Sequence, residues 1–352
     1  MITLSAEDRS AIDGAIGAAF DRLDARLSTL SADMRPLGGA MRRAAAGGKR
    51  FRPALVVASH RACTAGTPGD AVFEVAAAFE LLHTAFVIHD DVIDRDTERR
   101  GTPNVAGEFA ARAREQGISD AEATRLGEAA AILAGDVLLH EATRMIALAD
   151  VPSPTRAALL ELLHDAVLVS AAGELSDVSN AVRRDCPDTS ELLVATHDKT
   201  AVYSFAAPLR AGALLASAPA ATEAALGRAG GLAGLAFQLV DDLIGAFAPA
   251  AHAGRAEGAD LREAKRTPLV ALARESAVWS QVDEAIALAW TGPVAVRQAQ
   301  RALAASGARG RLEALVKTTL ADARVAAADD ALPAPATMLL AQVCDAIGAR
   351  IP

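Results

Sequence analysis

The stretch "ELLHTAFVIHDDVIDRDTERRGTPN", residues 80–104, joins an apolar run to a group of acids and then to a pair of arginines. Its apolar residues recur at three- and four-residue spacing, which predicts a helix over residues 71–94 that is buried on nearly all sides. Asp90 and Asp94 lie one turn apart on this helix, and Asp91 precedes Asp94 by three residues. Carboxylates this close repel one another, so the pattern predicts a cation beside them.

The rest of the chain is also rich in helical periodicity, and the alternation typical of strands is scarce. The 352 residues, 52% of them hydrophobic, are enough for a large core. We expect an all-α protein that forms a single domain over residues 1–352, with a loop at 248–267. The expected helices cover residues 1–46 (with a break near 35–40), 54–63, 71–94, 106–116, 120–147, 154–181, 189–216, 220–247 and most of the chain after 267.

Composition argues against several classes of protein. A net charge of −9 does not fit a general nucleic-acid binder. No uninterrupted apolar stretch of about 18 residues occurs, so we expect no membrane span. The acidic start "MITLSAEDRSAIDG" is unlike a secretory signal. Three widely spaced cysteines (Cys63, Cys186 and Cys344) predict neither a disulfide framework nor a zinc site, and we therefore expect a cytoplasmic protein.

A second acidic group lies in "FQLVDDLIG", residues 237–245, where Gln238, Asp241 and Asp242 follow the spacing i, i+3, i+4. Either group alone is also compatible with a solvated acidic helix end. Together they favour metal binding, because Mg²⁺ is typically held by one or two carboxylates plus substrate phosphates. Two such helices facing each other would hold a diphosphate on shared metal ions.

Cations stand near both groups. The chain has 31 arginines but only four lysines, and three of these (Lys49, Lys199 and Lys265) lie in motif-like surroundings. A lysine kept in so arginine-rich a chain hints that a compact ammonium is needed there. Arg99, Lys199 and Lys265 would complete the cage around the diphosphate. A second anion, held without metal, would bind a further set: Lys49, Arg52, His83 and Arg100.

Seven motifs in this order resemble the trans-isoprenyl diphosphate synthases of the polyprenyl synthetase family. They are "GGKRFRP", "ELLHTAFVIHDDVIDRDTERRG", "GDVLLHEA", "GELSD", "KTAVYSF", "FQLVDDLIG" and "DLREAKRTPL", and they span residues 47 to about 270. The resemblance implies the isoprenoid synthase helical bundle around a deep central cavity, assembled as a homodimer. It also implies a Mg²⁺-dependent prenyltransferase that joins isopentenyl diphosphate to an allylic diphosphate (dimethylallyl, geranyl or farnesyl) by ionisation, condensation and elimination.

The resemblance also implies roles for individual residues. Three Mg²⁺ per active site would be held by Asp90, Asp91, Asp94 and Asp241, which with Lys199 form the catalytic group. The allylic diphosphate would contact Arg99, Lys199, Thr200, Gln238, Arg255 and Lys265. Isopentenyl diphosphate would contact Lys49, Arg52, His83 and Arg100. Chain length would be set by Ala85 and Phe86, and we expect geranylgeranyl diphosphate, with farnesyl or a longer product as alternatives.

The chain departs from the family pattern in and near the second acidic group. Gly245 stands where a third aspartate is expected, Ala248 and Pro249 replace a glycine-aspartate pair, and Arg255 replaces a lysine. Further upstream, Glu174 stands where glutamine is commoner. These departures leave open a low-activity regulatory subunit of a heteromeric synthase. A terpene cyclase of the same fold is a further alternative, although it would not need the isopentenyl site.

Overall fold

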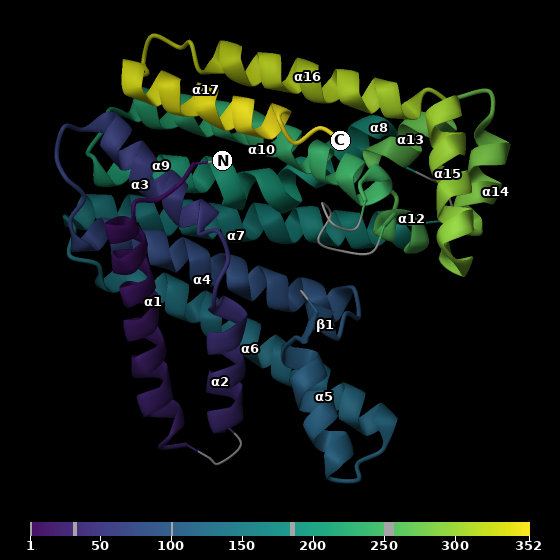
Figure 1. Ribbon diagram of the computed structural model, residues 1–352. Helices are drawn as coiled ribbons and strands as arrows, with labels where there is room; N and C mark the ends of the chain where they lie inside the picture. The colour runs from purple at the N-terminus through teal and green to yellow at the C-terminus, as the bar shows by residue number, and fades with distance from the viewer. Residues whose placement is uncertain (1, 31–33, 100, 184–186, 250–256) are drawn as a thin grey trace. The chain divides into compact units, whose positions relative to one another are not determined.

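The computed structural model describes residues 2–30, 34–99, 101–183, 187–249 and 257–352, and these are almost entirely helical (Figure 1). The all-α prediction is confirmed. Residue contacts divide the chain into two compact units, and each is described by itself. The N-terminal unit comprises Thr3–Glu161 and Ala211–Ser217; the C-terminal unit comprises Leu162–Arg210 and Ala218–Pro352. The single domain stays a prediction, because a division by contacts does not test it.

The N-terminal unit is built around α4 (Asp70–Ile93), which packs against α1, α3 and α6. Val75, Phe79 and Leu82 on α4 have no exposed surface. Each buried side chain of this size contributes about 1.5–3 kcal/mol, so α4 is a core helix. The other elements of the unit are α1 (Ala6–Leu27), α2 (Met34–Ala45), α3 (Phe51–Cys63), β1 (Glu98–Arg99), β2 (Thr102–Pro103), α5 (Val105–Glu115), α6 (Asp120–Leu148), the first residues of α7 (Ser153–Val182) and the last residues of α9 (Ala207–Leu215).

The C-terminal unit is built around α10 (Ala220–Phe247), which packs against η1 and α16. Leu226, Leu239 and Leu243 on α10 are fully buried. The unit holds the rest of α7 and most of the chain's short helices. These are α8 (Thr189–Thr196), η1 (His197–Ala206), the start of α9 (Ala207–Leu215), α12 (Ala259–Arg262), α13 (Pro268–Arg274), α14 (Trp279–Ala287), η2 (Ala289–Thr291), α15 (Pro293–Ala305), α16 (Ala308–Ala326) and α17 (Ala334–Gly348).

Most predicted helices are confirmed to within a residue or two, but the break near 35–40 is wrong. Residues 35–40 lie inside α2, which begins at Met34. Pro36 is tolerated there because the amide that proline lacks has no partner in the first helical turn. Two small elements were also missed: the β1–β2 hairpin at 98–103, and α12 within the predicted loop 248–267.

The predicted helix over 189–216 is interrupted by a different kind of helix. Its middle part, η1, is a π-helix of ten residues between α8 and α9. Hydrophobic periodicity does not distinguish a π-helix from an α-helix, so the π-helix could not be predicted from this pattern. π-helical segments are rare and are frequently found at functional sites, and this one carries Lys199 and Thr200.

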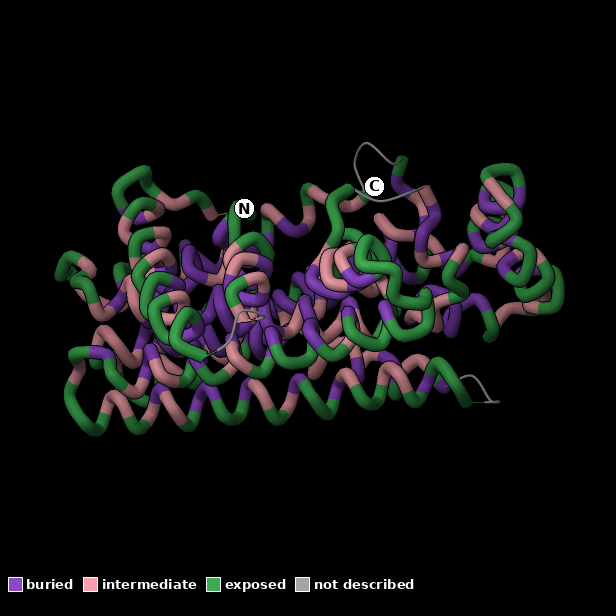
Figure 2. The backbone as a smooth tube through the Cα atoms, turned by 90° about the horizontal axis from the view of Figure 1, so that it is seen from below, coloured by how far each residue is buried: buried purple, intermediate pink, exposed green. Residues whose placement is uncertain are grey.

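Among the described residues, two helices, α4 and α10, are long and apolar enough to cross a membrane. Of their most apolar windows, 67% and 56% of the residues are buried inside the protein, as in core helices. In Figure 2 the exposed residues, drawn in green, follow outward helix turns and connecting loops. Cys63 and Cys344 are free thiols, and Cys186 lies outside the described residues.

Candidate active site

The three aspartates of the first group lie where α4 ends. Asp90 and Asp91 are in its last turn, and the Asp94 amide donates to the Asp90 carbonyl at 2.8 Å. The last turn of α4, all of it described, contains no basic residue. Because a helix C-terminus carries partial negative charge, three carboxylates there are unfavourable without a cation.

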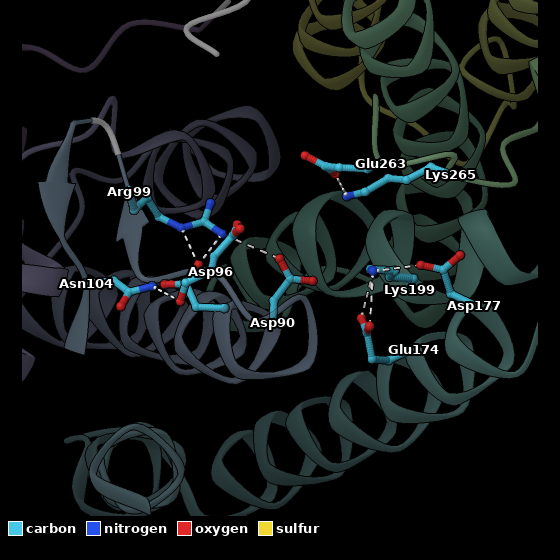
Figure 3. Close-up of polar contacts among 10 residues, drawn as sticks. Asp90, Asp96, Arg99, Asn104, Glu174, Asp177, Lys199, Glu263 and Lys265 are labelled. Carbon is cyan, nitrogen blue, oxygen red and sulfur yellow. Dashed lines mark hydrogen bonds and ion pairs between the residues drawn. The ribbon is translucent and has the colours of Figure 1, made fainter. Parts of the chain in front are cut away.

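The β1–β2 hairpin places the guanidinium of Arg99 next to these aspartates. Arg95 adopts a left-handed conformation (φ 58°), and Arg99 on β1 then pairs with Thr102 on β2. The Arg99 guanidinium lies 2.7 Å from Asp91 Oδ1 through Nε. Its Nη2 lies 3.5 Å from Asp90 Oδ2, and Figure 3 shows Arg99 directed toward Asp90. Burial raises the pKa of Asp91, and the contact with Arg99 opposes that rise.

The hairpin is fixed in place by Asn104, the N-cap of α5. Its side-chain amide donates to the Asp96 carbonyl at 2.7 Å, as Figure 3 shows, and its side-chain oxygen accepts from the Gly107 amide at 2.9 Å. The Asn104 amide also donates to the Thr97 carbonyl. Arg99 is therefore held against the aspartates by contacts within one short segment.

The basic glycine loop is attached to the same helix. Arg50 is buried, and its guanidinium donates to Glu80 on α4 at 3.0 Å and to Asp13 on α1 at 2.8 Å. His83 is half-buried and lies one turn beyond Glu80, so the loop joins α4 on the face of His83. Lys49 is exposed beside this anchor. Two more residues were predicted to contact isopentenyl diphosphate. Arg52 is half-buried, and Arg100 lies outside the described residues.

The two residues expected to set product length differ in burial. Ala85 has no exposed surface, whereas Phe86, four residues before Asp90, is half-buried. A half-buried ring on the aspartate-bearing face of α4 is compatible with a position beside a growing chain. Their role in chain length stays a prediction.

The second acidic group lies near the end of α10. The Gln238 side-chain amide donates to Asp242 Oδ1 at 3.3 Å. Asp242 is only 8% exposed, and burial raises its pKa well above the ordinary value. The carboxylates of Asp260 and Asp241 raise the Asp242 pKa further, which places three acids close together.

One cation at this group was missed by the sequence analysis. The Arg350 guanidinium, just beyond α17, forms an ion pair with Asp241. It also lies 4.3 Å from the centre of the Phe237 ring, a favourable cation–π distance. Arg350 Nη1 is buried and has no hydrogen-bond partner among the described residues. No motif pointed to Arg350, which stands more than 100 residues from Asp241 in the chain.

Lys199 is held by acids of α7. Its ammonium lies 3.0 Å from a Glu174 carboxylate oxygen and 2.9 Å from Asp177 (Figure 3). An ideal Cβ on Gly173 would lie 2.2 Å from the Lys199 amide nitrogen, so α7 and η1 approach too closely for any side chain there. This close approach positions Lys199 on the π-helix. Thr200 follows it and is half-buried.

Lys265 lies just after α12. Its ammonium is 3.3 Å from a Glu263 carboxylate oxygen, as Figure 3 shows, and its amide donates to the Asp260 carbonyl at 3.0 Å. The amide contact links Lys265 to the segment that carries Asp260. Arg255, the other cation predicted in this region, lies outside the described residues.

The side chains present fit Mg²⁺. In the parts of the chain that are described, no three His, Cys, Asp or Glu side chains converge closely enough to hold a metal ion by themselves. Mg²⁺ does not require that, since it often binds one or two carboxylates and takes the remaining ligands from phosphate and water. Each acidic group already holds a guanidinium, Arg99 on Asp90 and Asp91, and Arg350 on Asp241. Both groups therefore bind cations through carboxylate oxygens, the ligands that Mg²⁺ prefers.

Comparison with known sequences places the chain among prenyl synthases. The profile of the family described as Polyprenyl synthetase matches residues 36–303, more than half of the chain. Geranylgeranyl diphosphate synthase from Methanosarcina mazei is 34% identical over 233 residues, covering 66% of this chain and 65% of that protein. (2E,6E)-farnesyl diphosphate synthase from Mycobacterium bovis is 36% identical over 220 residues, covering 62% and 55%. The matches thus span less than two thirds of either relative's length.

Comparison with solved structures agrees with the sequence comparison. Geranylgeranyl pyrophosphate synthase from Corynebacterium glutamicum, crystallised with isoprenyl diphosphate and magnesium, is similar with a TM-score of 0.88. The sequence identity is 26%, and the alignment covers 97% of this chain and 98% of that one. This similarity confirms the predicted isoprenoid synthase fold. Together with the match over residues 36–303, it shows that the chain belongs to the polyprenyl synthetase family.

Proposed function

We propose that the protein is a trans-prenyltransferase that joins isopentenyl diphosphate to an allylic diphosphate and makes mainly geranylgeranyl diphosphate. Family membership supports the reaction class. The relatives described above are named for both the geranylgeranyl and the farnesyl product, so they support a short-chain enzyme without selecting one product. The half-buried Phe86 on α4 supports a product of limited length.

The observation that carries the proposal is that one compact unit holds two separate groups of charged residues, each of which would bind one anion. The aspartates and Arg99 lie at the end of α4, and the glycine loop is tied to the same helix through Arg50 and Glu80. A terpene cyclase binds one diphosphate and does not need the second set. An enzyme that condenses two diphosphates needs both.

In the proposed reaction, Asp90, Asp91, Asp94 and Asp241 would hold Mg²⁺, expected to be three ions, and Arg99, Lys199 and Lys265 would contact the allylic diphosphate. When bound, Mg²⁺ neutralises negative charge on the leaving diphosphate. Lys49, Arg52, His83 and Arg100 hold isopentenyl diphosphate so that its double bond attacks the allylic carbocation. The condensed cation loses a proton to the departing diphosphate. Apolar surroundings slow the competing capture by water.

The proposal includes a homodimer formed in part by α6. On this helix Leu126, Ile132 and Leu133 are 46%, 46% and 56% exposed, on neighbouring turns. Exposed apolar residues grouped on one helix mark interaction surfaces. Light scattering of the purified chain tests this: we expect a dimer that Leu126→Glu/Leu133→Glu converts to monomer, and a wild-type monomer contradicts it.

The function is tested with the purified chain alone. We expect it to convert isopentenyl and dimethylallyl diphosphate to a C20 product in Mg²⁺ and to stop when EDTA removes the metal. Hydrocarbon from an allylic diphosphate alone would instead identify a cyclase. Absence of turnover until a second synthase subunit is added would identify a regulatory subunit. A C15 or longer product would retain the reaction and correct the chain length.

A further inference from the structure

The glycine loop before α3 has an unusual backbone at Arg50. Gly47, Gly48 and Arg50 have positive φ angles of 73°, 76° and 51°. This left-handed conformation is readily adopted by glycine, but it is unfavourable for a residue with a Cβ atom. Such a residue persists only where its surroundings hold it, and such positions are concentrated at functional sites. The contacts that hold Arg50 therefore bear on the role of the loop.

The Arg50 side chain is buried and joins three helices of the N-terminal unit. Its Nε donates to Asp13 on α1 at 2.8 Å. Its Nη1 donates to the carbonyl of Ala45, the last residue of α2, at 2.8 Å and to Glu80 on α4 at 3.0 Å. Only 6% of the side chain is exposed. A lysine would not reproduce these contacts, because its ammonium lacks the planar fork of donors.

Stability alone does not account for the pair of Arg50 and Glu80. Glu80 is buried, and its Oε1 accepts from Arg50. Its Oε2 is buried and has no hydrogen-bond partner among the described residues. A buried carboxylate with one unsatisfied oxygen is unfavourable, and a buried ion pair is often replaced by apolar side chains without loss of stability. The pair therefore points to a requirement of the loop itself.

Arg50 lies between two cations that were predicted to contact isopentenyl diphosphate. Lys49 precedes it and is exposed, and Arg52 follows in the first turn of α3 and is half-buried. His83, predicted to contact the same substrate, lies one turn beyond Glu80 on α4. The pair of Arg50 and Glu80 thus connects the loop that carries two of these residues to the helix that carries the third.

We propose that Arg50, held by Glu80, is a positioning residue for isopentenyl diphosphate. It does not touch the substrate; it fixes Lys49 and Arg52 relative to α4 so that they receive the diphosphate in one geometry. The proposal rests on the proposed function, since that function brings isopentenyl diphosphate to this loop. The aspartates at the end of α4 are held separately, by Arg99. Loss of Arg50 should therefore weaken binding of one substrate and spare the other.

Four variants separate positioning from stability. Arg50→Lys keeps the positive charge and removes the planar fork of donors. Glu80→Gln keeps the shape of the side chain and removes its charge. Arg50→Met leaves the Glu80 carboxylate buried without its cation, whereas Arg50→Met/Glu80→Met replaces the whole pair by apolar side chains. Arg61→Lys is the matched control, because Arg61 joins α3 to α1 through Asp8 at a distance from the loop.

The measurements are the KM for each substrate, calorimetric binding of isopentenyl diphosphate in EDTA, and thermal unfolding. Arg50→Lys and Glu80→Gln should raise the KM and the dissociation constant for isopentenyl diphosphate about tenfold, with the allylic KM within about twofold of wild type, because a small misplacement of binding groups has effects of this size. Arg50→Met should also lower the midpoint of thermal unfolding by about 5 °C or more, since it leaves a buried carboxylate unpaired. The double variant should regain the midpoint and keep the raised KM.

Three results overturn the inference. One is a double variant with the wild-type KM for isopentenyl diphosphate, because stability would then be the whole role of the pair. Another is wild-type binding by Arg50→Lys or Glu80→Gln. The third is a loss that is equal for both substrates or equally large in Arg61→Lys. All three leave the proposed function standing, because wild type still condenses the two substrates. If wild type neither binds nor consumes isopentenyl diphosphate, the proposed function fails, and the inference fails with it.

Discussion

At the end of α4, the three aspartates and the arginine that pairs with them come from residues 90–99, whereas the charged groups around α10 come from segments as distant as Glu174 and Arg350. On α4, a two-stranded hairpin and one asparagine cap position Arg99. Around α10, the charged residues belong to several elements: α7 (Asp177), η1 (Lys199), α12 (Asp260) and the segment after α17 (Arg350).

The difference shows two ways of placing charge at a helix end. In the first arrangement, found at α4, one sequence motif contains all the charged residues. Substitutions elsewhere in the chain should therefore leave this group in place. A dispersed design depends on close approach of helices, such as the contact of Gly173 with Lys199 or of Gly245 with Asp260. We therefore expect substitutions at such helix contacts to affect the α10 group and to spare the α4 group.

The largest effect should come from the aspartates themselves. Asp90→Ala and Asp241→Ala should each lower kcat/KM by about 1000-fold, because groups that stabilise developing charge are worth that much. Steady-state kinetics checks this, with the exposed Asp120→Asn as the control. Wild-type activity of Asp241→Ala would mean that the acidic group of α10 has no part in catalysis. Only the acidic group of α4 would then act in the reaction.

The next effect tests the dispersed design. Gly173→Ala places a methyl group against the Lys199 backbone and should lower the free energy of unfolding by about 1–3 kcal/mol. It should also raise the KM for the allylic substrate, because Lys199 moves. Thermal unfolding and kinetics measure both. Gly310→Ala, in a helix with open space around it, should be neutral or slightly stabilising; equal effects of the two variants would argue against a special contact.

A smaller effect is expected from Glu174→Gln. Glu174 pairs with Lys199 and, in the proposed site, would compete with the diphosphate for it. Its neutralisation should therefore lower the KM for the allylic diphosphate about three- to tenfold while kcat changes little. Glu161→Gln on the same helix is the control. A higher KM would mean that Glu174 is needed to hold Lys199 in place, and competition would then be the wrong description.

Phe86→Ala should change the product rather than the rate. If the ring limits the growing chain beside α4, its removal lengthens the product by one or more isoprene units, while both diphosphate sites are untouched. Chromatography of dephosphorylated products measures this. Phe73→Ala, near the start of the same helix, should leave the distribution as it is; an unchanged distribution for Phe86→Ala as well would remove Phe86 as the limit.

The smallest effect should be on stability alone. Asp8 on α1 accepts two hydrogen bonds from Arg61 on α3, at 2.6 and 2.8 Å, and this contact lowers the pKa of Asp8 from 3.8. A lowered pKa stabilises the folded state above pH 3.8, and that stabilisation is lost as the pH falls through the folded-state pKa. Asp8→Asn should cost about 1 kcal/mol at pH 7, since Arg61 is half exposed.

The pH dependence of unfolding supplies the check on Asp8. The difference between wild type and Asp8→Asn should vanish near pH 2, with activity at pH 7 nearly unchanged in both. Asp345→Asn, which breaks an exposed pair with Arg324, should cost less than Asp8→Asn. A difference between wild type and Asp8→Asn that persists at low pH would mean that packing, rather than charge, is lost.

Sequence patterns predicted most of the helices and a cation beside the α4 aspartates, because both depend on short-range spacing. The bounds of α10 agree with the prediction at both ends, and Arg99 lies on the aspartates as its place in the motif suggested. The α10 group was predicted only in part. Asp260 and Arg350 reach it through packing of distant segments, and the π-helix at Lys199 has the same hydrophobic pattern as an α-helix. Such contacts have no signature in a single sequence.

The most direct test of the proposed function is a crystal structure of the chain with Mn²⁺ and a non-hydrolysable allylic thiodiphosphate, with the metals located by anomalous scattering. We predict metal ions that join one diphosphate to Asp90 and also to Asp241, with the prenyl tail directed toward Phe86. Metal ions bound to only one of these aspartates, with the other directed away from the diphosphate, would contradict the central claim that both acidic helices act on one substrate.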